Sequence, residues 1–210
     1  MKIHEIKDYC MFDTETTGLD FSSDRILEYG CIRVRDNTTT DTLRFLVKTG
    51  KYISQEASNI HGITQPDIDK DGIDPKEACS KVLEFFGSDF ILGVNNLFFD
   101  LPMLEVECNR HSLPRPKAIT WFDIGMLHKG MMIGQVWNQK EPFFNYAQRI
   151  KNLRIRGVRY SVDFMVKHYE VENLRENGMH DAVTDIKLCK HIFDKIKVKY
   201  GEIQPNQPKA

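Results

Sequence analysis

The stretch YCMFDTETTG, residues 9–18, holds a strand pattern and a pair of acids. Its first four residues are apolar, which is typical of a strand buried in a sheet. Asp13 and Glu15 lie two residues apart, and because side chains alternate along a strand, both carboxylates point to one face. Two such acids repel unless a hard cation lies between them or one carries a proton. The stretch alone therefore predicts either a metal site or an exposed turn at a strand end.

Strand and helix patterns follow this stretch along the chain. Residues 26–35 and 43–47 have strand patterns, and the polar residues 36–40 between them predict a hairpin turn. Short links make these strands antiparallel neighbours of the first. Helix and strand patterns then alternate over residues 75–87, 90–94, 100–110 and 119–122, and the last third has helical patterns over residues 142–153, 162–168 and 181–199. This order predicts an α/β fold with a mixed sheet covered by helices.

Composition limits the class of protein. The 210 residues are 41% hydrophobic and 28% charged, which excludes a disordered or disulfide-stapled chain. The net charge is −1, so affinity for a polyanion must come from local patches or bound metal. Five cysteines without a close pair, and no signal peptide or membrane-spanning pattern, predict a cytoplasmic protein with no membrane partner. We expect one domain over residues 1–203 and a flexible tail over residues 204–210.

Two further motifs add acids and a histidine. Asp100 ends the segment NNLFFD, which directly follows the strand of residues 90–94, and ligands gather at the carboxyl ends of strands in α/β sheets. His180 and Asp185 lie five residues apart at the start of the last helix, so they share a site only if His180 lies in the loop before it. Four convergent carboxylates could hold two divalent ions, Mg²⁺ or Mn²⁺, and a neutral histidine could take a proton from water. This set of groups predicts phosphodiester hydrolysis.

The three motifs in this order resemble those of the DnaQ-like 3′–5′ exonucleases of the DEDDh branch. That superfamily includes the proofreading epsilon subunit of DNA polymerase III, ribonuclease T and oligoribonuclease. The resemblance covers roughly residues 7–199. Its matching segments are Phe12–Leu19, Arg25–Gly30, Ile60–Thr64, Asn96–Asp100 and His180–Asp185. It implies a ribonuclease-H-like fold, with a mixed five-stranded sheet and helices on both faces.

The resemblance also implies roles for individual residues. Metal ligands would be Asp13, Glu15, Asp100 and Asp185, and these four would form the catalytic set together with His180 as general base. Residues implied to bind the terminal nucleotide or support the substrate strand are Thr14, Thr16, Gly18, Leu19, His61, Asn96 and Phe99. The chain departs from the family at Asn95, where a histidine is frequent.

A basic segment distinguishes this chain from compact family members. We expect it to be helical and extended, over about residues 129–160, and between Glu141 and Asp163 it carries no acid. Its five basic residues are Arg149, Lys151, Arg154, Arg156 and Arg159. With the aromatic rings between them they could form a nucleic-acid patch, or they could be a solvated helix face whose rings pack inward.

These features together predict a two-metal-ion 3′–5′ exonuclease that releases 5′-mononucleotides from single-stranded nucleic acid. The spelling DTETTG favours the DNA members, while an exoribonuclease of the ribonuclease T or oligoribonuclease kind remains open. A polymerase or another replication or repair protein is the expected partner. Two other classes stay under consideration: a catalytically silent nucleic-acid-binding or polymerase-accessory module, and a phosphatase or nucleotide hydrolase with the same metal geometry.

Overall fold

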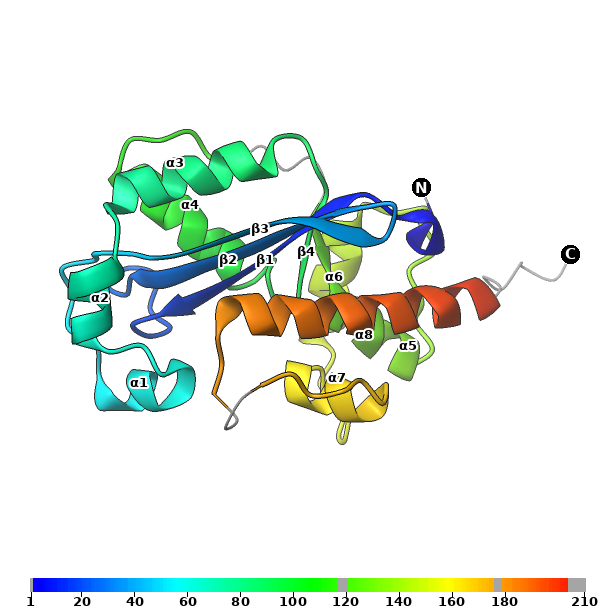
Figure 1. Cartoon of the computed structure of the whole chain (residues 1–210). Coiled ribbons are helices and arrows are strands. Elements are labelled where there is room, and N and C mark those ends of the chain that lie inside the picture. The colour runs from blue at the N-terminus through cyan, green and yellow to red at the C-terminus, as the bar shows by residue number, and fades with distance from the viewer. Residues whose placement is uncertain (1, 117–120, 176–178, 204–210) are drawn as a thin grey trace, which may run out of the picture.

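A five-stranded sheet in the order β3-β2-β1-β4-β5 runs through the molecule (Figure 1). The computed structural model describes residues 2–116, 121–175 and 179–203. Its strands are β1 (Tyr9–Thr16), β2 (Ile26–Arg35), β3 (Thr38–Leu46), β4 (Ile91–Gly93) and β5 (Trp121–Asp123). The first three strands are antiparallel neighbours, and β4 pairs parallel with both β1 and β5. The predicted mixed sheet is therefore confirmed.

The hairpin between β2 and β3 is tighter than the sequence suggested. The expected turn covered residues 36–40, but β3 already begins at Thr38. Asp36 and Asn37 alone make the turn, both with positive φ, 43° and 65°. Such a two-residue turn matches the right-handed twist of the flanking strands, and Asp and Asn tolerate left-handed backbone better than most residues. The threonines that looked like turn residues therefore belong to an edge strand.

Helices cover both faces of the sheet, as predicted. In Figure 1, α3 and α4 lie on one face and α8 crosses the other. The helices are η1 (Ile3–Glu5), α1 (Gln55–His61), α2 (Gln65–Asp71), α3 (Pro75–Phe86), α4 (Asp100–Arg110), α5 (Ile124–Met132), α6 (Phe143–Asn152), α7 (Val162–His168) and α8 (Ala182–Glu202). None of the helices in the described parts of the chain combines the length and hydropathy needed to cross a membrane.

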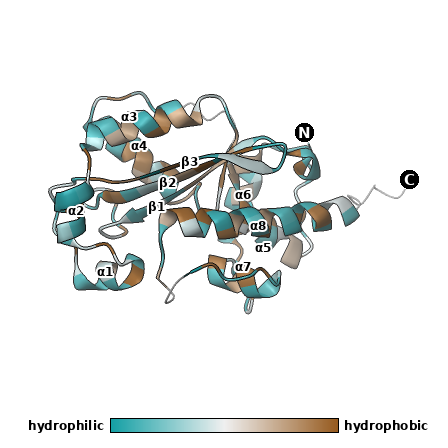
Figure 2. Cartoon of the chain, viewed as in Figure 1, coloured by the Kyte–Doolittle hydropathy of each residue, from teal (hydrophilic) through white to brown (hydrophobic). Residues whose placement is uncertain are grey.

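The core lies where the strands meet these helical layers. Figure 2 shows hydrophobic residues concentrated along the central strands and on the helices beside them. Phe12 of β1 packs edge-on against Phe86 of α3 with ring centroids 5.1 Å apart, and on the other face Tyr9 meets Phe193 of α8 at 5.5 Å. Because β1 is covered on both faces, its apolar residues run without alternation. This buried strand ends at the acids of the first motif.

Helices α1 and α2 were not predicted from the sequence. Each has seven residues, too few for a helical period to stand out. Ser54 caps α1, and a capping box between Thr64 and Asp67 starts α2. They cover a second, smaller hydrophobic cluster made of Leu27, Ile53, Ala57, Ile63 and Ile68. The histidine of the Ile60–Thr64 segment is therefore placed by a helix end.

Two predicted features lie partly or wholly outside the described residues. The predicted tail, residues 204–210, lies wholly outside them. Residues 119–120 of the predicted last strand also lie outside them, and the described part of that strand begins at Trp121.

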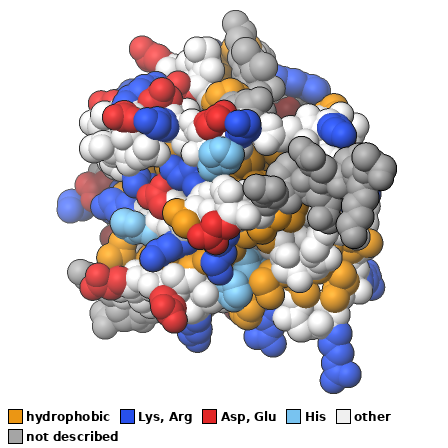
Figure 3. All heavy atoms as spheres, turned by 90° about the vertical axis from the view of Figure 1, so that its right-hand side faces the viewer, with side chains coloured by type: hydrophobic (Ala, Val, Ile, Leu, Met, Phe, Trp, Pro, Cys, Tyr) orange, Lys and Arg blue, Asp and Glu red, His pale blue; other side chains and the backbone are white. Residues whose placement is uncertain are grey.

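On the face shown in Figure 3, basic and acidic side chains are interspersed among apolar ones, in line with the net charge of −1. That face carries no large field of one sign.

Candidate active site

The first two acids lie near the carboxyl end of β1. Glu15 is buried and Asp13 half-buried. Burial, followed by the charges of Asp100, Glu15 and Asp185, raises the pKa of Asp13 well above its usual range. Burial and the charge of Asp185 raise the pKa of Glu15 to about 8. The four acids of the sequence motifs therefore lie within electrostatic reach of one another.

Asp100 enters this cluster as the first residue of α4. It is 3% exposed, and its Oδ1 accepts a hydrogen bond of 2.7 Å from the Thr14 hydroxyl. Burial raises the pKa of Asp100 to about 7, against the lowering effect of that hydrogen bond. Thr14 itself is buried, and its side chain positions Asp100.

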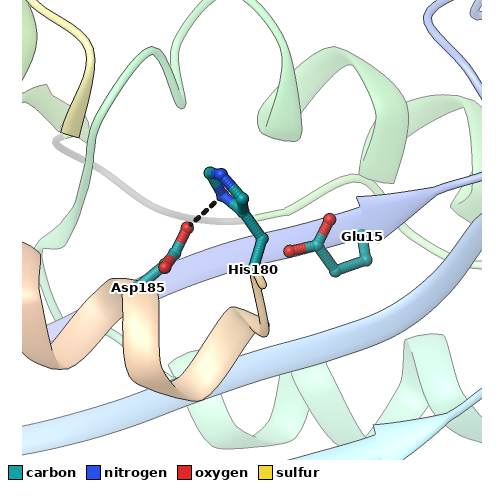
Figure 4. A group of neighbouring side chains, drawn as sticks. All are labelled: Glu15, His180 and Asp185. Atoms are coloured by element: carbon teal, nitrogen blue, oxygen red, sulfur yellow. Dashed lines mark hydrogen bonds and ion pairs between the residues drawn. The ribbon is translucent and has the colours of Figure 1, made fainter. Parts of the chain in front are cut away.

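The third motif joins the cluster from the start of α8. His180 lies in the loop before the helix, as its spacing from Asp185 requires, and its backbone N–H donates to the Ile60 carbonyl. The His180 Nδ1 lies 2.9 Å from Asp185 Oδ2 (Figure 4). Potential ligand atoms of Glu15, His180 and Asp185 all lie within 4.8 Å of one another. The structure thus brings together side chains from opposite ends of the chain.

Close packing between α8 and β2 makes this approach possible. Gly30 of β2 pairs with Asp13 in the sheet register, and a Cβ at Gly30 would lie 2.6 Å from the Cβ of Ala182. Any side chain at this position would push the start of α8 away from the sheet. Glycine at position 30 therefore lets Asp185 reach the carboxylates of β1.

Glu28, which carried no predicted role, anchors the same helix start. Its side chain is fully buried, and its Oε2 accepts from the Ala182 backbone N–H at 3.0 Å. Arg44 of β3 donates to the other oxygen at 2.7 Å. The signal available in the sequence was an acid in the apolar first half of a strand, and an acid is rarely buried without a partner. Glu28 therefore positions the third motif over the sheet.

Arg175 is a second residue that the sequence did not single out. Its guanidinium donates two hydrogen bonds to the Asp185 carboxylate, from Nε to Oδ1 at 2.6 Å and from Nη2 to Oδ2 at 2.7 Å. A lone arginine five residues before His180 belongs to no recognisable pattern. Its contact with Asp185 could be recognised only in the folded chain, which turns back between α7 and α8.

The turn after β1 has the form that a close backbone approach requires. A Cβ on Gly18 would lie 2.4 Å from a carboxylate oxygen of Asp24, so no other residue fits without displacement. The Thr16 hydroxyl donates to the Gly18 carbonyl at 2.7 Å, which holds the turn closed. Leu19 follows with 78% of its surface exposed. An exposed leucine at this point is available for contact with a ligand.

The remaining implied substrate residues are His61, Asn96 and Phe99. His61 ends α1 and is buried, and burial lowers its pKa. Its Nδ1 accepts from the Ile63 N–H, while its Nε2 has no hydrogen-bond partner among the described residues. Asn96 is fully buried, and neither of its amide atoms has a partner in the described part of the chain, which is uncommon. Phe99 is half-buried, and its ring centroid lies 5.9 Å from that of Phe21. A cavity of about 880 Å³ is lined by His61 and His180.

Asp123 caps α5, as its position before that helix predicts. Its Oδ1 accepts from the backbone N–H of Met126 and from that of Asn95, both at 3.1 Å. Burial raises the pKa of Asp123 to about 6. Asn95 itself has a positive φ of 61°. Asp123 therefore holds the loop of the second motif against the end of β5.

The basic segment divides into paired and unpaired residues. Helix covers residues 143–152 and the end of α5, and the segment is otherwise irregular. Phe143 and Tyr146 are buried, so these rings pack inward. Arg149 pairs with Glu141 at 2.6 Å, and the Lys151 ammonium lies 3.9 Å from the ring centre of Phe98. Four of the five basic residues are exposed and form no ion pair within the described ranges: Lys151, Arg154, Arg156 and Arg159.

Comparison with known proteins gives one family match and many relatives. The family model described as Exonuclease (RNase_T) matches residues 10–193. The DNA polymerase III PolC-type of Thermotoga petrophila is 34% identical over 188 residues, which is 88% of this chain and 11% of that protein. The corresponding protein of Mycoplasma genitalium is 27% identical over 211 residues, 93% of this chain and 14% of that protein. The chain thus spans a small part of the polymerases that it matches.

The solved structures show the same fold. E. coli Exonuclease I in complex with a dA16 oligonucleotide superimposes with a TM-score of 0.73 at 18% sequence identity. The match covers 94% of this chain and 42% of that one. At this identity the likeness shows a shared fold only. The chemistry must be argued from the residues of the site.

Proposed function

The chain belongs to the exonuclease family within the DnaQ-like superfamily, and on this premise we propose that it is a metal-dependent 3′–5′ exonuclease acting on single-stranded DNA. The observation that carries the proposal is the cluster of four acids around the end of β1. Mutual repulsion and burial raise the pKa of Asp13 and of Glu15. A protein keeps such a cluster at a cost to stability, and a bound cation offsets that cost.

The donor set fits divalent cations. Carboxylate oxygens are the ligands that Mg²⁺ and Mn²⁺ prefer. Within the described ranges, no Lys or Arg side chain forms an ion pair with Asp13, Glu15 or Asp100. We assign the metal site to these three residues and Asp185. Divalent cations held there supply activation of water and neutralisation of the leaving oxygen.

His180 is the proposed general base. When its Nδ1–H donates to the ionised Asp185, the Nε2 lone pair stays free to accept a proton. The side chain is 34% exposed, so water and substrate can reach it. It would take a proton from the water that attacks the terminal phosphodiester. The bond to the 3′ oxygen of the preceding nucleotide then breaks, which releases a 5′-mononucleotide and leaves a new 3′ hydroxyl.

Several residues around the acids would hold the terminal nucleotide. The exposed Leu19 would pack against a base, and the turn of Thr16 and Gly18 would offer backbone amides to the 3′ end. His61 and Asn96, whose buried side chains hold polar atoms without a partner among the described residues, would support the strand end. Phe99 would support the strand and the position of Asp100. Thr14 would contact the terminal nucleotide beside the turn of Thr16 and Gly18.

DNA is the substrate that we favour over RNA. The relatives named above are DNA polymerases, and the superimposed Exonuclease I is in complex with a dA16 oligonucleotide. A choice between sugars depends on contacts to the 2′ hydroxyl. We also propose that the domain works with a polymerase or another replication or repair protein. The similarity to segments of PolC-type polymerases supports this partner.

The unpaired basic residues would guide the strand toward the site. Arg159 and Tyr160 line a cavity of about 480 Å³ together with Val94 and Asn95 of the second motif. Arg154 and Arg156 lie exposed in the same loop. Exposed arginines beside a ring can bind phosphates and stack on bases. Lys151 and Arg149 belong to the same patch but already contact Phe98 and Glu141.

One experiment separates the possible activities. The purified chain is incubated with 5′-labelled single-stranded DNA, single-stranded RNA or duplex DNA, in Mg²⁺, Mn²⁺ or chelator. We expect a ladder that shortens from the 3′ end of single-stranded DNA, with 5′-mononucleotide as product and no cleavage in chelator. A ladder confined to RNA would assign an exoribonuclease. Binding without cleavage would assign an accessory module, and attack on free mononucleotides would assign a nucleotide hydrolase.

A further inference from the structure

The Asp185 carboxylate is held by a buried arginine, unlike the other acids of the cluster. Arg175 and Asp185 are 3% and 7% exposed, and two parallel hydrogen bonds join them at 2.6 and 2.7 Å. A third hydrogen bond ties the Arg175 Nη1 to Asp163 of α7. A bidentate pair removed from water is a strong interaction. The Arg175 guanidinium therefore binds two carboxylates, and one of them, Asp185, is a proposed metal ligand.

Arg175 and His180 leave a divalent cation about one of the lone-pair positions of Asp185. An ionised carboxylate offers about four lone-pair positions. Asp185 already faces three nitrogens, two from Arg175 and one from His180, at 2.6, 2.7 and 2.9 Å. A cation bound directly to Asp185 would meet these donors and the positive charge of the guanidinium. The two cations therefore compete for one carboxylate.

We infer that Arg175 is the internal counter-ion of Asp185 and competes with the divalent metal, so that it sets how much metal the site requires. This inference rests on the proposed function, because it takes Asp185 as a metal ligand. Arg175 acts through Asp185 and touches neither substrate nor reacting atoms. It is a positioning residue, and the quantity that reports its role is metal affinity.

The test is a titration of the purified, metal-stripped full chain with Mn²⁺, in which electron paramagnetic resonance measures free Mn²⁺. Arg175→Met removes the competing charge while keeping the length of the side chain. We expect it to bind Mn²⁺ about tenfold more tightly than the wild type. Arg175→Lys keeps the charge and should stay within about threefold of the wild type. Equal or weaker Mn²⁺ binding by a folded Arg175→Met variant would overturn the inference.

A second variant protects the test against misfolding of the first. Asp163 is 63% exposed, so Asp163→Asn should fold while it loosens the outer anchor of the guanidinium. We expect two- to fivefold tighter Mn²⁺ binding from it. If Arg175→Met does not fold, unchanged binding by Asp163→Asn overturns the inference.

Two controls keep this inference and the proposed function apart. Lys81→Met breaks an exposed pair with Glu77 on α3, on the far face of the sheet, and should leave Mn²⁺ affinity unchanged. Asp185→Asn should lose a Mn²⁺ site. If Asp185→Asn binds Mn²⁺ as the wild type does, the metal assignment of the proposed function fails. If Asp185→Asn loses the site and Arg175→Met leaves affinity unaltered, only the role of Arg175 fails.

Discussion

Helix α4 buries two carboxylates, and the protein treats them in opposite ways. Glu107 is 2% exposed and accepts hydrogen bonds from Arg25 at 2.7 and 3.1 Å and from Arg110 at 2.8 Å. Asp100, two turns earlier, is 3% exposed, and its Oδ1 accepts from the Thr14 hydroxyl. On α4, the carboxylate that is paired with two arginines is already neutralised, whereas the one left with a hydroxyl must be neutralised in another way. We attribute this difference to the metal proposed at the Asp100 end.

The largest effect that tests this contrast is loss of activity at the acidic cluster. We expect Asp100→Asn, like Asp13→Asn and Asp185→Asn, to reduce cleavage of labelled single-stranded DNA by at least about three orders of magnitude, because each removes a metal ligand. The Asp100 variant should stay folded by circular dichroism, since it deletes a charge that burial disfavours. Wild-type turnover in Mg²⁺ by any of these variants would refute the metal assignment.

The next largest effect is a slower rate of hydrolysis without loss of metal binding, from a change of the proposed general base. We expect His180→Ala to slow hydrolysis by about two to four orders of magnitude, the usual range for a general base. Mn²⁺ affinity should be largely kept, because the four carboxylates remain. Single-turnover rates and a Mn²⁺ titration on the same sample measure both quantities. An unchanged rate would remove His180 from the mechanism.

At the other end of α4, the matching change of Glu107 should lower stability and leave activity unchanged. Glu107→Gln leaves Arg25 and Arg110 without their counter-charge, both about a fifth exposed. We expect the free energy of unfolding to fall by about 2 kcal/mol, less than for a fully buried pair. Urea denaturation measures this. Cleavage per folded molecule should stay near the wild-type value, and its loss would contradict the division of roles along α4.

The last effect is a pH dependence confined to the metal-free protein. The pKa of Glu15 is raised to about 8 and that of Asp100 to about 7, above the usual value of about 4 in an unfolded chain. The folded state then keeps protons that the unfolded chain releases, so this contribution to stability is lost as pH rises from about 4 to 8. We expect the thermal midpoint in chelator to fall between pH 5 and 8. Asp100→Asn should show a shallower fall, and an equal slope would contradict this assignment.

Much of the fold could be predicted because its signals are local. The apolar run of β1, the helical spacing of α3 and the proline at its start each lie within a dozen residues. Three short motifs, each close to a strand end or a helix start, identified the family in their order along the chain. Helices α1 and α2 escaped this reasoning because seven residues carry too little periodicity.

Sequence alone determined the order of the acids and the histidine, since the alternation of a strand and the turn of a helix depend on neighbouring residues. Folding decided which charges those acids meet. Glu28 holds the backbone N–H of Ala182, 154 residues away, and Arg175 reaches Asp185 because the chain reverses between α7 and α8. Whether a buried carboxylate meets an arginine, as Glu107 does, or only a hydroxyl, as Asp100 does, depends on contacts between distant segments, and such contacts exist only after the chain has packed.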